Sequence, residues 1–291
     1  PLLTRFTFGE ICMKILILGK NGNLGNELAQ LLSKSEYELL LWDKRELDIT
    51  KKERVEEKIT AAKPDIVINC TGYTNVDRAE EDYITAMLIN CHAVGYIAQA
   101  CNIIGAIFVH FSTGMVFPGD NPKGYNEEDK PSPVNAYGRS KFLGETEVKK
   151  KIDNHYIIRT EWLYAKTENP NAKKSFTEII LEMADKQEFL QGVIDEIGRP
   201  TWTKDLAKAS IDLVLSKATY GVYHIANNGQ ASRLEWAKEI LAMKGISKNI
   251  NPVSGSIFPR PAKRPQYELL NNTKLTPLRS WQEALQEYLN S

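Results

Sequence analysis

The chain has 291 residues, of which 42% are apolar, and its 37 Lys and Arg balance 37 Asp and Glu. This length suits one large domain or two ordinary ones with a substantial core. A formal net charge of zero disfavours nucleic acid and anionic membrane surfaces as partners. Uninterrupted apolar runs such as residues 15–18 and 66–68 are far shorter than the roughly 20 residues that cross a bilayer, so no membrane partner is expected.

The cysteines give no sign of a metal or disulfide site. No Cys-x-x-Cys pair occurs, so neither a zinc cage nor a disulfide framework is expected, and we predict reduced thiols in a cytoplasmic protein. Residues 1–12 lack the apolar core of a secretory signal and are expected to be a non-native or disordered leader before Met13. The four cysteines are Cys12, Cys70, Cys91 and Cys101.

From residue 14 onward, short apolar runs alternate with longer amphipathic stretches. This alternation predicts an α/β fold, a Rossmann-type doubly wound parallel sheet. Ligands bind such a sheet beyond the carboxyl ends of its strands. The predicted strands are residues 14–18, 38–42, 66–69, 106–111 and 156–159, and the predicted helices between them are 23–33, 51–62, 83–104 and 136–151.

After Tyr164 the alternation loosens into helical stretches separated by Gly and Pro. We therefore predict a mainly dinucleotide-binding domain over residues 13–164. A smaller mixed substrate lobe is expected over residues 165–291, with some of its chain returning to the first domain. The helices predicted in this lobe are residues 176–186, 203–216, 233–243 and 281–289.

A glycine-rich loop, Gly19 to Gly25, directly follows the first strand and opens a helix. Glycines let the backbone turn sharply and approach a pyrophosphate, while a helix N-terminus offers free N–H groups. The spacing is G-x-x-G-x-x-G rather than the commoner G-x-G-x-x-G, but its position between strand and helix predicts a dinucleotide site. A glycine-rich turn without a ligand is the alternative.

Asp43 ends the second strand, about 20 residues after the loop, where a carboxylate can accept hydrogen bonds from ribose hydroxyls. This favours NAD, but Lys44 and Arg45 could meet a 2′-phosphate, so NADPH stays open beside NADH. A solvated turn is the alternative here. Asp48 and Ile49 are expected to contact adenine.

Tyr137 and Lys141 lie four residues apart, which places both on one face of the predicted helix. An ammonium beside a phenol lowers the phenol pKa and prepares it for proton exchange with a carbonyl or alcohol oxygen. Ser112 and Thr113 end a predicted strand and bring hydroxyls to the same sheet edge. Together with the dinucleotide loop, these groups form a catalytic constellation.

In combination, these motifs resemble the dTDP-4-dehydrorhamnose reductase family of the extended short-chain dehydrogenase/reductases, from about Met13 to the C-terminus. The resemblance rests on residues 19–25, 73–80, 111–113 with 116–119, 137–141 with 144–145, 159–164, 198–201 and 264–265.

The resemblance implies that Thr113, Tyr137 and Lys141 are catalytic. Tyr137 would protonate the C4 oxygen of a sugar, Lys141 would tune Tyr137 and hold the nicotinamide ribose, and Thr113 would bind the same oxygen. The substrate residues it implies are Val76, Gly114, Met115, Trp162 and Arg264. The expected cofactor residues are Gly19, Asn21, Gly22, Asn23, Leu24, Gly25, Asp43, Asp48, Ile49, Thr71, Gly72, Tyr73, Tyr137 and Lys141.

Three of these assignments have open alternatives. Trp162 could be a core aromatic residue, and Arg264 could form a structural salt bridge. The family has Asp-Tyr after the catalytic Thr, where this chain has Gly114 and Met115. We therefore expect poor handling of dTDP-4-dehydrorhamnose or acceptance of another 4-keto sugar, unless water or another side chain restores the lost contacts. Epimerase activity is not supported, because Met115 cannot titrate.

The leading interpretation is an NADH- or NADPH-dependent reductase of a nucleotide-linked 4-keto-6-deoxysugar, most simply dTDP-4-dehydrorhamnose, in nucleotide-sugar and surface polysaccharide biosynthesis. The alternatives are a reductase of a different nucleotide-linked 4-keto sugar and a nucleotide-binding regulatory subunit resembling the methionine adenosyltransferase beta subunit. The resemblance also suggests a homodimer. No motif identifies a metal site.

Overall fold

The computed structural model describes residues 13–166 and 174–291. The predicted leader, residues 1–12, lies outside the described residues, as does Cys12. The first part of the chain runs β1 (Lys14–Leu18), α1 (Asn23–Leu32), β2 (Glu38–Trp42), α2 (Lys52–Ala62), β3 (Ile66–Asn69), α3 (Arg78–Glu81), α4 (Tyr83–Met87), a π-helical turn (Leu88–His92), α5 (Ala93–Ile104), β4 (Ile107–Thr113), a 3-10 turn (Gly114–Val116), α6 (Ala136–Lys151), β5 (His155–Thr160) and β6 (Leu163–Tyr164).

The second part contains shorter strands between longer helices. It runs α7 (Phe176–Lys186), β7 (Phe189–Val193), β8 (Ile197–Gly198), β9 (Thr201–Trp202), α8 (Thr203–Leu215), β10 (Gly221–His224), β11 (Ala231–Ser232), α9 (Arg233–Met243), β12 (Asn249–Val253), a 3-10 turn (Gly255–Ile257), β13 (Tyr267–Glu268) and α10 (Trp281–Asn290).

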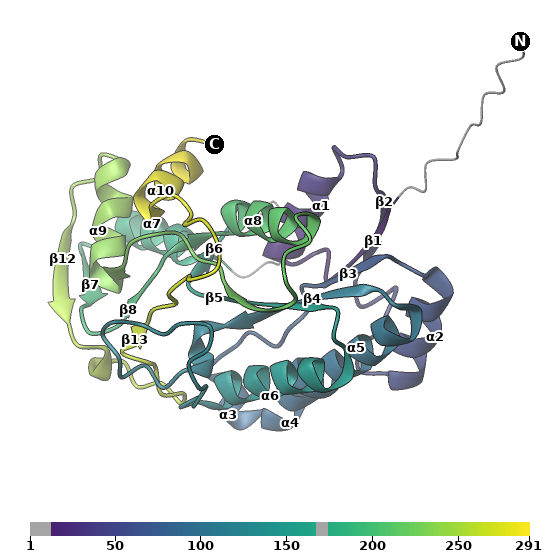
Figure 1. The fold of residues 1–291 in the computed structure, drawn as a ribbon. Helices are drawn as coiled ribbons and strands as arrows, with labels where there is room; N and C mark the ends of the chain where they lie inside the picture. Colours follow the sequence, from purple (N-terminus) through teal and green to yellow (C-terminus); the bar gives the residue numbers. More distant parts are fainter. Residues whose placement is uncertain (1–12, 167–173) are drawn as a thin grey trace, which may run out of the picture.

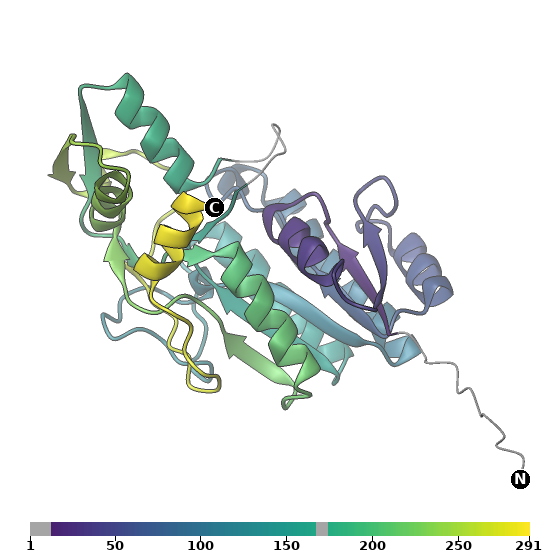
Figure 2. The same cartoon turned by 90° about the horizontal axis from the view of Figure 1, so that it is seen from above.

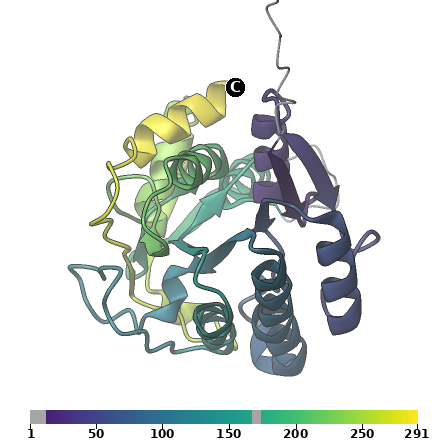
Figure 3. The same ribbon diagram turned by 45° about the vertical axis from the view of Figure 1, so that its right-hand side comes forward.

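Six parallel strands form the central sheet, in the order β10-β5-β4-β3-β1-β2. The order reverses between β1 and β3, and a doubly wound sheet binds its ligands at such a reversal. Figures 1 and 3 show α1 and α8 over one face and α2, α5 and α6 over the other. The predicted Rossmann-type α/β fold is confirmed, and all five predicted strands of the sheet and the helices between them are present.

Successive side chains of a β-strand point to opposite faces of the sheet, so the strands contribute to a core on each face. Leu16 and Leu18 of β1 pack toward α2 and α5, whereas Ile15 and Ile17 pack toward α1 and α8. Strand β1 is therefore apolar on both faces, which is why residues 15–18 form an unbroken apolar run.

Residues Tyr83–Ile104 form one continuous helical segment of 22 residues with mean hydropathy 1.3, long and apolar enough to cross a membrane by length and composition. Polar residues such as Asn90 and His92 interrupt the segment, so the uninterrupted apolar runs of the sequence do not reveal it. Val94, Ile97 and Cys101 of this segment are buried in the core beneath the sheet. Such burial is typical of a core helix.

The second lobe has its own core of aromatic side chains, including Trp202, Trp236, Trp281 and Tyr164. Figure 2 shows α7, α9 and α10 beside the six-stranded sheet. Strand β10 leaves this part of the chain and pairs with β5 at the sheet edge. The division into a dinucleotide-binding domain and a substrate lobe remains a proposal.

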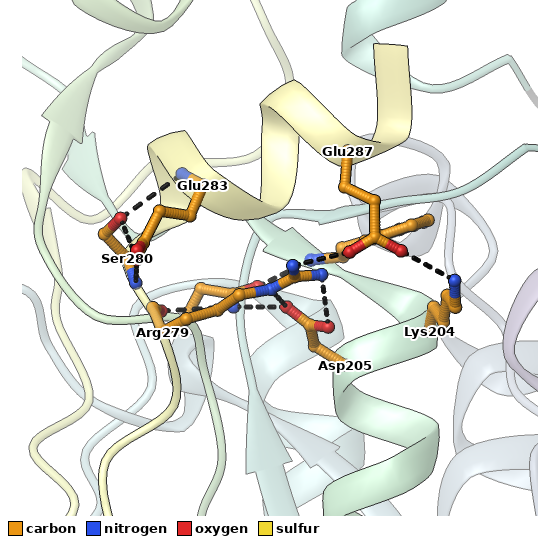
Figure 4. Close-up of polar contacts among 8 residues, drawn as sticks. Lys204, Asp205, Arg279, Ser280, Glu283 and Glu287 are labelled. Carbon is orange, nitrogen blue, oxygen red and sulfur yellow. Dashed lines mark hydrogen bonds and ion pairs between the residues drawn. The ribbon is translucent and has the colours of Figure 1, made fainter. Parts of the chain in front are cut away.

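The C-terminal helix is fixed against α8 by an ion-pair network (Figure 4). Arg279 donates two hydrogen bonds of 2.8 Å to the carboxylate of Asp205 and one of 2.6 Å to Glu287. Ser280 and Glu283 form a capping box that begins α10. These contacts anchor the start of α10 to α8, a helix that covers one face of the central sheet.

Candidate active site

The glycine-rich loop is a tight turn between β1 and α1. The Gly19 N–H donates to the Trp42 carbonyl at 2.8 Å, and the Gly22 N–H donates to the Gly19 carbonyl at 3.0 Å. A Cβ on Gly25 would lie 2.2 Å from the Gly19 carbonyl oxygen, so only glycine allows the helix to begin this close to the loop. Gly22 caps α1 without a side-chain hydrogen bond, which leaves N–H groups free for an anion.

A cavity of about 190 Å³ lies beside this loop at the carboxyl ends of β1, β2 and β3. Six of the residues predicted to bind the cofactor line it, which fits an adenosine moiety entering at the reversal of strand order. Those six residues are Gly19, Asp43, Asp48, Ile49, Thr71 and Gly72.

Asp43 lies at the edge of this cavity with its carboxylate held in place. It accepts hydrogen bonds from the Arg45 N–H at 2.7 Å and the Asn21 amide at 2.5 Å. The backbone N–H of Arg45 is the main cause that lowers the pKa of Asp43. Asp43 is therefore ionised at neutral pH and suited to accept hydrogen bonds from a ribose. Lys44 also lines the cavity, so the structure keeps both NADH and NADPH open.

Asp48 behaves differently, because its carboxylate is already used within its own turn. The Thr50 backbone N–H and hydroxyl donate to one Asp48 oxygen at 3.0 and 2.7 Å. Its side chain therefore stabilises the turn, and an adenine contact at this place would come from the backbone or from Ile49.

Asn90 joins the loop after β3 to the catalytic helix. Its amide oxygen accepts from the Tyr73 N–H at 2.8 Å, and its amide nitrogen donates to the Tyr73 carbonyl at 3.0 Å and the Ser140 hydroxyl at 2.9 Å. Sequence reasoning missed this residue. The available signal was a polar residue within the apolar stretch 83–104, at a position the structure buries in the π-helical turn.

Thr113 and Tyr137 lie beside each other where β4 ends and α6 begins, and Lys141 lies on the same helix. Thr113 is the last residue of β4, and its hydroxyl lies near enough to the Tyr137 phenol to lower the pKa of that phenol. Asn135 caps α6 by accepting from the Gly138 N–H at 2.7 Å, which sets the start of the helix one residue before Tyr137. Lys141 follows one turn later, and its Nζ donates to the Phe111 carbonyl at 2.5 Å.

The protonation states differ from the sequence-based expectation. Burial, and next the charge of Glu268, raise the pKa of Tyr137 to about 12, while Thr113 opposes the shift. Burial lowers the pKa of Lys141 to about 8. The expected lowering of the phenol pKa by Lys141 is therefore wrong for this arrangement. At neutral pH Tyr137 carries its proton and can donate it.

Trp162 combines the two interpretations considered for it. Its ring stacks on Trp236 with centroids 5.9 Å apart, and the Arg233 guanidinium lies 3.4 Å from its centroid. Its indole N–H nevertheless points to the site, where it donates to Glu268 at 3.1 Å. Trp162 is thus a packed aromatic residue whose indole N–H is directed at the Glu268 carboxyl group.

Three other residues, Arg264, Val76 and Met115, are predicted to bind substrate. Arg264 donates to Asp77 at 2.6 Å and to the Ala262 carbonyl at 3.0 Å, so the structural salt bridge that was the alternative is present. This ion pair ties the segment before β13 to the loop that carries Val76, which is half-buried. The Met115 sulfur accepts from the Asn135 amide at 3.8 Å.

Gly114 lies directly against Glu268, a residue that sequence reasoning did not single out. The Thr113 hydroxyl donates to the Glu268 carboxyl at 3.4 Å. Burial raises the pKa of Glu268 to about 7, against the lowering effect of Arg233. No local pattern marks a glutamate that reaches the site from a two-residue strand.

The chain is similar to proteins of known family over nearly its whole length. The family model described as "RmlD substrate binding domain" matches residues 13–291. The chain is 35% identical to the spore coat polysaccharide biosynthesis protein SpsK of Bacillus subtilis, over 95% of this chain and 96% of that protein. It is also 35% identical to a Streptomyces antibioticus protein named "Probable dTDP-4,6-dihydroxy-2-methyloxan-3-one 4-ketoreductase", over 94% of each.

The fold is similar to that of a solved dTDP-4-dehydrorhamnose reductase from Bacillus anthracis in complex with NADP. The TM-score is 0.91 and the identity is 35%, with 96% of this chain and 99% of that chain covered. The similarity therefore extends over almost the whole chain, including β4 and α6, which carry the three predicted catalytic residues.

Proposed function

The chain belongs to the RmlD substrate binding domain family, and from this membership we propose that it reduces dTDP-4-dehydrorhamnose to dTDP-rhamnose with NADH or NADPH. The observation that carries the proposal is the position of the Thr113 hydroxyl beside the protonated Tyr137 phenol, at the same edge of the sheet as the dinucleotide loop. The proposal is supported by the similarity to the Streptomyces antibioticus protein named as a probable 4-ketoreductase and to the solved dTDP-4-dehydrorhamnose reductase of Bacillus anthracis.

The residues present fit a dinucleotide, which supplies the hydride when bound. Gly25 and the free N–H groups of α1 would hold its pyrophosphate, and Asp43 would accept from its adenosine ribose. The ammonium of Lys141 would contact the second ribose. These groups bind and orient the dinucleotide, and proton transfer to the substrate is left to Tyr137 with Thr113.

Tyr137 supplies the proton of the reduction. Its pKa of about 12 keeps the phenol protonated at neutral pH, and its position beside Thr113 lets both groups approach one ketone oxygen. As negative charge develops on that oxygen, the phenol proton moves to it and the C4 alcohol forms. Thr113 orients the oxygen, and Lys141 holds the ribose of the dinucleotide next to the catalytic tyrosine.

Oxidation of NADH and NADPH against a panel of dTDP-, UDP- and GDP-linked 4-keto-6-deoxysugars tests this function. We expect turnover of the dTDP sugar with kcat/KM above about 10⁴ M⁻¹s⁻¹. Turnover of another nucleotide sugar alone would reassign the substrate. If NADPH binds but no sugar is reduced, the regulatory-subunit interpretation replaces the reductase.

Asp43→Ala should weaken NADH binding by about tenfold and NADPH binding less. Only the unphosphorylated ribose presents both hydroxyls to the carboxylate, and the 2′-phosphate is repelled by it. Fluorescence titration gives both dissociation constants, and Glu53→Ala on the exposed face of α2 is the charge-matched control. An unchanged ratio of the two constants would show that Asp43 is a solvated turn residue.

We also propose a cytoplasmic location and a nucleotide sugar as the main partner, without nucleic acid or membrane. A homodimer remains a prediction. Sedimentation of the purified chain tests the oligomeric state.

A further inference from the structure

Glu268 is a buried carboxyl group at the centre of the candidate active site. It is the second residue of β13 and only 4% exposed. Its two oxygens accept hydrogen bonds from the Thr113 hydroxyl at 3.4 Å and the Trp162 indole at 3.1 Å. Burying a carboxyl group is unfavourable unless its interactions compensate, and both of its partners belong to the site.

The space that Glu268 occupies exists because residue 114 is glycine. A Cβ at Gly114 would lie 2.8 Å from Cγ, 3.1 Å from Oε1 and 3.4 Å from Cδ of Glu268, and these are its three nearest atoms. The φ of Gly114 is outside the left-handed region, so the glycine serves to admit the glutamate rather than to permit a turn. Any side chain at position 114 would displace this carboxyl group.

The surrounding charges keep part of Glu268 ionised. Arg233 from α9 is the main charge that lowers its pKa, Arg264 before β13 contributes, and burial raises the pKa to about 7 overall. Two further titratable groups face it, Tyr137 on α6 and Glu161 after β5. A carboxylate in this place can accept a hydrogen bond from a hydroxyl group.

We propose that Glu268 determines sugar specificity by accepting a hydrogen bond from the hydroxyl on the ring carbon next to the reacting ketone. The proposal rests on the proposed function. A ketone oxygen held by Thr113 and Tyr137 is adjacent to the Glu268 oxygen that Thr113 contacts, and the C3 hydroxyl is the ring hydroxyl nearest to that ketone. Glu268 thereby provides the contact that Gly114 cannot.

The first experiment compares two substrates with the Glu268→Gln variant, which keeps the shape of the side chain. For dTDP-4-dehydrorhamnose, kcat/KM should fall by about 10-fold to 100-fold, because a carboxylate acceptor is lost. For a dTDP-linked 4-keto-3,6-dideoxyhexose, which lacks the C3 hydroxyl, it should change by less than about threefold. Equal losses, or none, on the two substrates would overturn the proposal.

The matched control is Glu127→Gln. Glu127 is also 4% exposed, but it accepts from Thr273 outside the site. We expect it to alter the melting temperature without changing the ratio of kcat/KM between the two sugars.

The pH dependence is a second readout. Wild-type kcat/KM for the sugar with the C3 hydroxyl should rise as pH rises through about 7, and Glu268→Gln should lose this rise.

The second experiment moves the carboxyl group to position 114. Gly114→Asp alone should lower kcat/KM because its side chain collides with Glu268, and Glu268→Ala alone should lower it because the acceptor is missing. The double variant Gly114→Asp with Glu268→Ala should recover to within about tenfold of the wild type. A double variant no better than either single variant would contradict the shared space, provided that melting temperatures show folded proteins.

These results separate the two proposals. A wild type that reduces none of the sugars refutes the proposed function, and the role of Glu268 with it. A wild type that reduces dTDP-4-dehydrorhamnose while Glu268→Gln keeps its substrate ratio refutes the role of Glu268 alone.

Discussion

Tyr137→Phe should lower kcat by about 10² to 10⁴ while leaving the dissociation constant of NADPH nearly unchanged. Tyr137 is half-buried beside the Thr113 hydroxyl, and its pKa of about 12 keeps the phenol protonated at neutral pH. Removing the hydroxyl removes the proton donor but keeps the ring that packs at the start of α6. Steady-state kinetics and a fluorescence titration of NADPH measure the two effects separately.

The control for this variant is Tyr96→Phe, on α5 beneath the sheet, whose ring packs against the core there. It should leave both kcat and cofactor binding unchanged. If Tyr137→Phe lowers kcat by less than tenfold, Tyr137 is not the proton donor. If it weakens NADPH binding as strongly as it lowers kcat, its main role is to hold the cofactor.

Glu145→Ala should destabilise the fold by about 3 to 5 kcal/mol, because it leaves a buried charge without its partner. Arg159 on β5 is 1% exposed and donates from Nε and Nη2 to the two oxygens of Glu145 at 2.9 and 2.7 Å. Its neighbour His224 offers no negative charge in place of the carboxylate, because an imidazole is neutral or positive, and burial keeps it neutral by lowering its pKa to about 3. Urea unfolding measures the change in free energy.

Glu147→Ala is the matched control, because Glu147 lies on the same helix and pairs with Lys151 at 3.0 Å where both side chains are partly exposed. It should cost less than about 1 kcal/mol. Similar costs for the two variants would mean that the Arg159 pair is no stronger than a surface pair.

The charge of Glu145 also raises the pKa of Lys141, so the loss of Glu145 should lower the pKa of Lys141 further.

Much of the fold could be predicted from the sequence because the responsible interactions are local. An apolar run such as residues 15–18 is buried on both faces of the sheet, and so its composition alone indicates a central strand. The glycines of residues 19–25 and the four-residue spacing of Tyr137 and Lys141 are likewise fixed by adjacent backbone geometry. These features placed the dinucleotide loop and the catalytic helix.

The tertiary structure alone decided which distant side chains complete the site. Glu268 lies 155 residues from Thr113 in the chain, and Arg264 lies 187 residues from Asp77. No period or spacing links such pairs, because their contact depends on how the C-terminal segment returns across the ends of the strands. The protonation of Tyr137 was misjudged for the same reason. Burial and the charge of Glu268 set its pKa, and both arise only when the chain is folded.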